Sequence, residues 1–146
     1  MAVDQEYIDA LLANPSESLT VEIKDWIDPR SIHGQAKIIK ACIAMRNQNG
    51  GFLQVGFENS TWIPKLADAP ADVRATWNSD EIKALVSRFA SDFFEVHLRF
   101  GERGGQEFLI LEVEPGVRSP VASKRELVDP QDASRKLVKA HAVYVR

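Results

Sequence analysis

Apolar residues recur along the chain with two spacings, one typical of helices and one typical of strands. Helical spacing marks three segments: 5–13, 34–47 and 79–91. Alternation of apolar and polar residues marks four segments, of which the last two flank a glycine-rich turn: 20–26, 52–58, 95–100 and 107–114. Because helices and strands do not alternate strictly in this order, we predict an α+β domain with a mixed sheet and three helices.

Two other segments complete the predicted domain. Residues 60–78 contain two tryptophans and two prolines without a clear period, which predicts a long loop. The last six residues, HAVYVR, alternate again and predict a closing strand. Since the chain stops on this strand without a polar tail, we expect residues 1–146 to be a single domain from the N-terminal part of a longer protein.

Composition is that of a globular protein, with 45% hydrophobic and 27% charged residues. No apolar run approaches the roughly 18 residues that a membrane span needs. The first residues are acidic where a secretory signal would be basic, and the single Cys42 can form no internal disulfide. We therefore expect a cytoplasmic protein with no membrane contact, and we expect Cys42 to pack in the core.

Charge is unevenly distributed along the chain. The formal net charge is −3, which argues against indiscriminate binding of nucleic acid. Residues 118–146, however, hold seven Lys/Arg and three Asp/Glu, so this part of the chain is basic and the remainder is acidic. Such a basic segment would suit a local patch that contacts phosphates, although charge alone favours a solvated loop and strand edge.

Several familiar active-site patterns are missing from the sequence. The three histidines, His33, His97 and His141, have no spacing that would gather a zinc ion. There is no Gly-x-x-x-x-Gly-Lys-Ser/Thr phosphate loop and no Gly-x-Ser-x-Gly around a serine. These absences leave the carboxylates of the strand segments as candidates for chemistry.

Three glutamates form the remaining candidate site, namely Glu17, Glu22 and Glu58. If segments 20–26 and 52–58 are neighbouring strands, Glu22 and Glu58 could share one face with Lys24 and Gln54. Glu17 could join them only if the chain bends near Glu17, because a continuous strand sends residues five apart to opposite faces. Converging carboxylates suit Mg²⁺ or Mn²⁺, whereas separate ones are ordinary solvated charges.

Several stretches together resemble the Schlafen AlbA-type domain. The two longest are ESLTVEIKDW at 17–26 and KIIKACIAMRNQNGGFLQVGFEN at 37–59. Shorter matches follow in the same order: SDEI at 79–82, EVEPG at 112–116, RSPVASK at 118–124 and VYVR at 143–146. The resemblance covers nearly the whole chain, and it implies a nucleic-acid-binding domain with an α+β, Schlafen AlbA-type fold.

The resemblance also implies a possible activity, because active Schlafen proteins are metal-dependent endoribonucleases that cut structured RNA such as tRNA. Their two glutamates and one aspartate carry over to Glu17, Glu22 and Glu58 as catalytic residues and ligands of Mg²⁺ or Mn²⁺. The third position departs from the family pattern, since glutamate replaces aspartate there and is one methylene longer. This departure puts catalysis in question without affecting binding.

Basic residues are expected to contact the phosphates of the nucleic acid: Lys24, Lys124, Arg125 and Arg146. Because the Schlafen core closes around RNA with two such units and this chain has one, we expect a homodimer. Two alternatives stay open. One is a non-catalytic DNA-binding module of a transcriptional regulator or defence protein. The other is a protein-interaction or dimerisation module anchored by Trp62 and Trp77.

Overall fold

A mixed sheet of four strands organises the domain. The computed structural model describes residues 4–116 and 119–146, so Arg118 of the basic segment lies outside the described residues. The sheet has the strand order β1 (Val21–Lys24), β2 (Gly51–Val55), β4 (Gln106–Val113) and β3 (Val96–Arg103). Strands β1 and β2 are parallel, while β4 is antiparallel to both β2 and β3. The predicted α+β class and mixed sheet are confirmed.

Helix α2 (Ile32–Asn47) connects the two parallel strands. It begins where Ser31 accepts a 2.9 Å hydrogen bond from the Gly34 amide, which satisfies one of the unpaired amides of the first turn. It ends at Asn47, and the chain turns away at Asn49 and Gly50, which have positive φ angles of 75° and 96°. Since β1 and β2 are parallel, α2 runs antiparallel to both and brings the chain back along the sheet.

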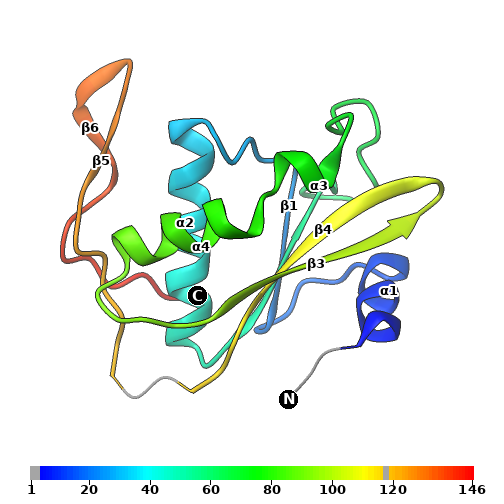
Figure 1. Ribbon diagram of the computed structural model, residues 1–146, viewed down its shortest axis with the longest axis horizontal. Coiled ribbons are helices and arrows are strands. Elements are labelled where there is room, and N and C mark those ends of the chain that lie inside the picture. The colour runs from blue at the N-terminus through cyan, green and yellow to red at the C-terminus, as the bar shows by residue number, and fades with distance from the viewer. Residues whose placement is uncertain (1–3, 117–118) are drawn as a thin grey trace.

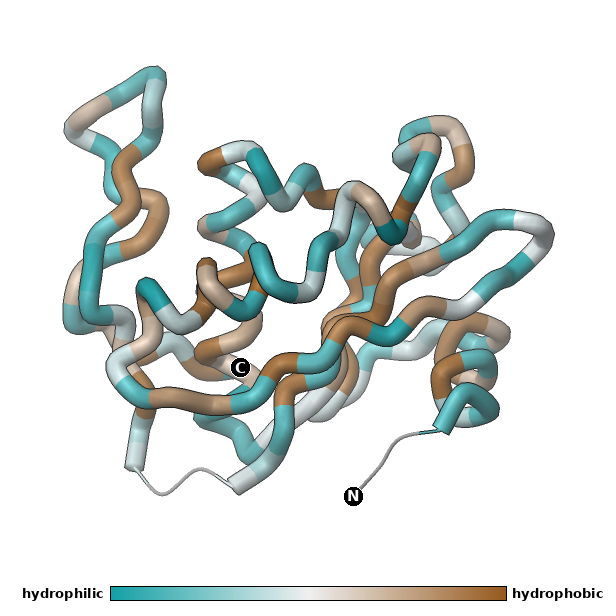
Figure 2. The backbone as a smooth tube through the Cα atoms, viewed as in Figure 1, coloured by the Kyte–Doolittle hydropathy of each residue, from teal (hydrophilic) through white to brown (hydrophobic). Residues whose placement is uncertain are grey.

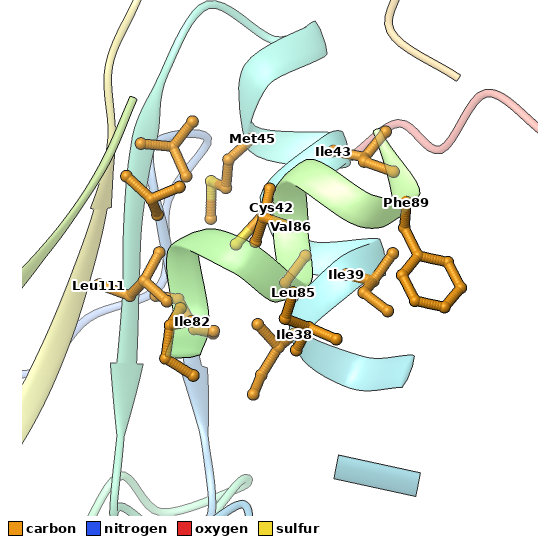
Figure 3. Close-up of a cluster of buried hydrophobic side chains, with 14 of the residues drawn as sticks. Ile38, Ile39, Cys42, Ile43, Met45, Ile82, Leu85, Val86, Phe89 and Leu111 are labelled. Atoms are coloured by element: carbon orange, nitrogen blue, oxygen red, sulfur yellow. The ribbon is translucent and has the colours of Figure 1, made fainter. Parts of the chain in front are cut away.

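Helices cover both faces of the sheet (Figure 1). Helix α1 (Gln5–Ala13) packs Ile8 and Leu12 on one face, against a small cluster that includes Val21 and Ile23 of β1. On the other face, α2 and α4 (Ser79–Phe89) form the larger core with the sheet. Figure 3 shows this core, in which Cys42 of α2 lies among buried apolar side chains, as predicted.

The three predicted helices are present within one or two residues of their expected bounds. The predicted hairpin is also present as β3 and β4, although β3 continues three residues beyond its expected end. The predicted long loop is partly helical, because one short helix, α3 (Val73–Thr76), lies near its end. Trp77 follows it and is 1% exposed, whereas Trp62 is half-buried against the α1 side. Trp77 is therefore a core residue and no anchor for a partner.

The C-terminal part of the chain differs from the prediction. The predicted closing strand 141–146 is wrong, because these residues form no strand. His141 and Ala142 exchange backbone hydrogen bonds with Ser123, and the Tyr144 carbonyl accepts from Asn47 of α2. A separate hairpin, β5 (Leu127–Asp129) and β6 (Asp132–Val138), precedes them instead. It extends away from the sheet in Figure 1, and Figure 2 shows hydrophilic residues at its far end. None of the helices in the described residues has the length and apolar character needed to cross a membrane.

Candidate functional site

A groove of about 700 Å³ runs between strand β1, helix α2 and the last three residues of the chain. We call it the β1–α2 groove. Three segments that are far apart in the sequence line it: Ser18, Leu19, Glu22 and Lys24 from the β1 region; Lys37, Lys40, Ala41 and Ala44 from α2; and Tyr144, Val145 and Arg146. The groove is larger than two other surface hollows, which have volumes of about 130 and 400 Å³.

Strand β1 supplies one wall because it is an edge strand whose two faces differ. Val21 and Ile23 point toward α1 and are buried, at 5% and 2% exposed. Glu22 and Lys24 point to the opposite face, toward α2, where the strand has no neighbour beyond it to cover them. Alternation along a strand at the sheet edge therefore presents a carboxylate and an ammonium group to the groove.

Helix α2 supplies the second wall with residues one helical turn apart. Lys37, Lys40, Ala41 and Ala44 have the spacing of a single helix face, and that face borders the groove. The alanine methyl groups are small, so they leave room for a ligand between the helix and the strand. The two lysines extend from the same face, and none of the ion pairs within the described residues involves either of them.

The C-terminal residues close the end of the groove at the beginning of β1. The Arg146 guanidinium donates hydrogen bonds to the carbonyls of Ser18 and Val21, at 2.7 and 3.2 Å. The Asn47 side chain of α2 donates to the Tyr144 carbonyl at 2.8 Å. These bonds hold residues 144–146 between the strand and the helix, which explains why HAVYVR forms no strand of its own.

The groove carries four cationic groups and one carboxylate among its described lining residues. That carboxylate, Glu22, is already shared between two of the cations. Its Oε1 lies 3.6 Å from Lys24 Nζ, and its Oε2 lies 3.3 Å from Arg146 Nη1. Lys37 and Lys40 form no ion pair with any residue in 4–116 or 119–146, so their positive charge is left over and the groove favours an anionic ligand.

The three predicted catalytic glutamates lie in different settings. Glu22 lines the groove, but Glu17 and Glu58 do not. The chain does bend between Glu17 and Glu22, since Ser18 and Val21 exchange backbone hydrogen bonds of 3.0 and 3.4 Å across Leu19 and Thr20. Leu19 precedes the buried Val21 by two residues, but it is 70% exposed because of this bend.

Glu58 leaves the sheet after an irregularity at the end of β2. The amides of Gly56 and Phe57 both donate to the Lys24 carbonyl, as in a β-bulge, and Gly56 has a φ angle of 107°. Glu58 is then exposed in the following turn. The expectation that Gln54 shares a face with Glu22 is wrong. Gln54 is paired with Ile23, and its side chain donates to the Leu11 carbonyl beneath α1.

These positions give no three-carboxylate site. Among residues 4–116 and 119–146, no group of three or more histidine, cysteine, aspartate or glutamate side chains is arranged to hold a metal ion. The single groove carboxylate faces two cations, which compete with a divalent ion for its oxygens. The residues therefore do not fit a Mg²⁺ or Mn²⁺ site in this arrangement, and metal binding stays a prediction of the resemblance.

The predicted basic contacts divide into two groups. Lys24 and Arg146 line the groove, whereas Lys124 and Arg125 are exposed outside it, in the loop before β5. Lys37 and Lys40 were not among the predicted contacts. The sequence shows that both lysines lie on the polar face of a predicted helix. It does not show that this face borders the edge strand β1.

Family comparison bears on the same residues. The family model described as Schlafen, AlbA_2 matches residues 17–146. This chain belongs to the Schlafen AlbA_2 family. The matched range includes every residue of the β1–α2 groove and excludes helix α1. Membership of the Schlafen AlbA_2 family supports the expectation of a nucleic-acid-binding domain. No curated protein matches this chain.

Proposed function

We propose that this Schlafen AlbA_2 domain binds nucleic acid and that the β1–α2 groove holds the backbone phosphates. One observation carries the proposal: Lys24, Lys37, Lys40 and Arg146 converge on a groove whose one carboxylate, among the described lining residues, is already paired. The chain as a whole is acidic, so a local excess of positive charge must supply the attraction for phosphates.

The cations of the groove have different tasks in this proposal. Lys37 and Lys40 are flexible ammonium groups that can each approach a phosphate oxygen as a point charge. Arg146 is held by two backbone carbonyls and by Glu22, so it shapes the groove and lends charge without moving. Neutralising phosphates with lysines releases condensed counterions, which makes the binding strongly dependent on salt.

Binding to a labelled nucleic acid at several salt concentrations tests the proposal. We expect the double substitution Lys37→Glu, Lys40→Glu to weaken binding at least about tenfold at low salt and to reduce the salt slope by about two. Lys83→Glu is the matched control, because Lys83 is an exposed helical lysine on α4 that does not line the groove. Equal losses for both variants would contradict the proposal.

Endoribonuclease activity is a separate, finer prediction that rests on the family resemblance. It is tested by incubating the domain with tRNA and Mn²⁺ and comparing the wild type with Glu22→Ala. Cleavage that depends on Glu22 would support a catalytic role for this carboxylate. Equal cleavage by both proteins would rule out this site, and binding without cleavage would favour a DNA- or RNA-holding module.

A further inference from the structure

The two ends of the β1–α2 groove differ in chemistry. Because α2 runs antiparallel to β1, the end of β1 lies beside the beginning of α2, so Lys24 and Lys37 line the same end of the groove. That end is cationic, with Lys24 and Lys37. At the other end, the start of β1 meets the C-terminal residues. There Leu19 and Val145 border the groove beside the Arg146 guanidinium, which is already bound to two backbone carbonyls and to Glu22.

The apolar end is unusual for a surface that contacts only phosphates. Leu19 and Val145 are 70% and 71% exposed, although both line the same groove as the lysines. Between them and the cationic end, the helix contributes Lys40 and the methyl groups of Ala41 and Ala44. A phosphate gains nothing from these apolar side chains, whereas the flat face of a nucleobase gains from covering them.

Base faces are accessible only where a nucleic acid is unpaired. In a duplex each base is stacked between its neighbours, so a side chain at the surface contacts phosphate, sugar or base edges. In a single strand the bases can turn toward apolar or aromatic side chains while the backbone follows a basic groove. The β1–α2 groove offers both kinds of surface within one hollow.

We propose that the groove takes an unpaired strand, with phosphates on the lysines at the cationic end and a base on Leu19 and Val145 at the apolar end. This inference rests on the proposed function, since it specifies which form of nucleic acid the same groove binds. We take nucleic acid rather than a second copy of this chain as the occupant, because the lysines suit the closely spaced phosphates of a strand and the apolar end suits a base.

Fluorescence anisotropy with one labelled strand, alone and annealed to its complement, tests the inference in both RNA and DNA. We expect the wild type to bind the single strand at least about fivefold more tightly than the duplex. The double substitution Leu19→Ser, Val145→Ser removes apolar surface from exposed positions, so we expect it to lose about fivefold for the single strand and little for the duplex. Ile63→Ser, at a 57% exposed position that does not line the groove, is the matched control.

The outcomes separate this inference from the proposed function. Equal binding of single strand and duplex, with the lysine dependence intact, would overturn the inference and leave the proposed function standing. Absence of any binding that depends on Lys37 and Lys40 would overturn both. A double variant that changes the oligomeric state in light scattering, while keeping its preference for the single strand, would show that Leu19 and Val145 serve a second copy of the chain and would overturn the inference.

Discussion

The two faces of helix α2 have opposite surroundings, although they alternate along the same sixteen residues. One face carries Ile38, Ile39 and Ile43, each 0% exposed, into the core between the sheet and α4 (Figure 3). The other face carries Lys37 and Lys40 along the β1–α2 groove. The first face excludes water completely, while the second leaves two ammonium groups available to a ligand.

This difference teaches which substitutions test the fold and which test the function. A change on the core face removes packing that the whole domain shares, so it lowers the free energy of unfolding. A change on the groove face touches few neighbours, so it alters binding with little effect on stability. The predictions below would fail if the two faces were not separable in this way.

The largest effect is expected for the alkylation rate of Cys42, which lies on the core face of α2. Burial, and to a smaller extent the charge of Glu22, raises the pKa of this thiol to about 12. The thiolate is therefore scarce at pH 8, and alkylation by iodoacetamide in the native state should be slower by about a thousandfold than in urea-unfolded protein. Because the folded-state pKa is raised, this group contributes stability below pH 9 that is lost as the pH rises toward 12. Rapid native alkylation would place Cys42 outside the core.

Ile39→Ala tests how much the packing of the core face contributes to the stability of the domain. The side chain is fully buried between α2 and α4, so its truncation leaves a cavity and should lower the free energy of unfolding by about 3 kcal/mol. Urea unfolding followed by circular dichroism measures this loss. Lys37→Ala on the groove face is the matched comparison, with an expected change within about 0.5 kcal/mol. Similar losses for the two variants would contradict the separation of the faces.

Arg146→Ala tests how the C-terminal residues complete the groove. The substitution removes two hydrogen bonds to backbone carbonyls and the ion pair with Glu22, so we expect a loss of about fivefold in nucleic-acid affinity and about 1 kcal/mol in stability. Arg125→Ala is the control, since it removes the same charge outside the groove. If Arg125→Ala weakened binding more than Arg146→Ala, the loop before β5 would be the contact surface.

Glu22→Gln should change nucleic-acid affinity the least of these substitutions, and it should raise the affinity rather than lower it. It removes the carboxylate of the groove while keeping the shape of the side chain, so phosphate affinity should rise by about twofold. Glu81→Gln, which neutralises a paired carboxylate on α4 away from the groove, should leave the affinity unchanged. A clear fall in affinity for Glu22→Gln would indicate that this carboxylate binds a ligand group or a metal ion.

Much of the fold followed from the sequence because its main elements have strong periods and clear ends. Helix α2 was predictable from its apolar stripe, with Ser31 at its start and Asn49-Gly50 at its end. The β5–β6 hairpin was not predictable, because most of β6 is polar and exposed and shows no apolar alternation. HAVYVR alternates like a strand, but its carbonyls and side chains bind α2 and the start of β1 instead.

The site was predictable only in part. Glu22, Lys24 and Arg146 were identified from the strand pattern and the family resemblance, and all three line the groove. Lys37 and Lys40 could not be assigned, since a helix period shows which residues are polar but not what the polar face borders. The crossover from β1 to β2 decides that, and it is a long-range property of the fold.

The central claim is that nucleic acid contacts the β1–α2 groove, and mapping the contact by NMR tests it most directly. Titrating the labelled domain with a short oligonucleotide should shift the amide signals of three separate segments that meet only at the groove: residues 18–24, 37–44 and 144–146. Shifts confined to Lys124, Arg125 and the β5–β6 hairpin, with these three segments unchanged, would contradict the account.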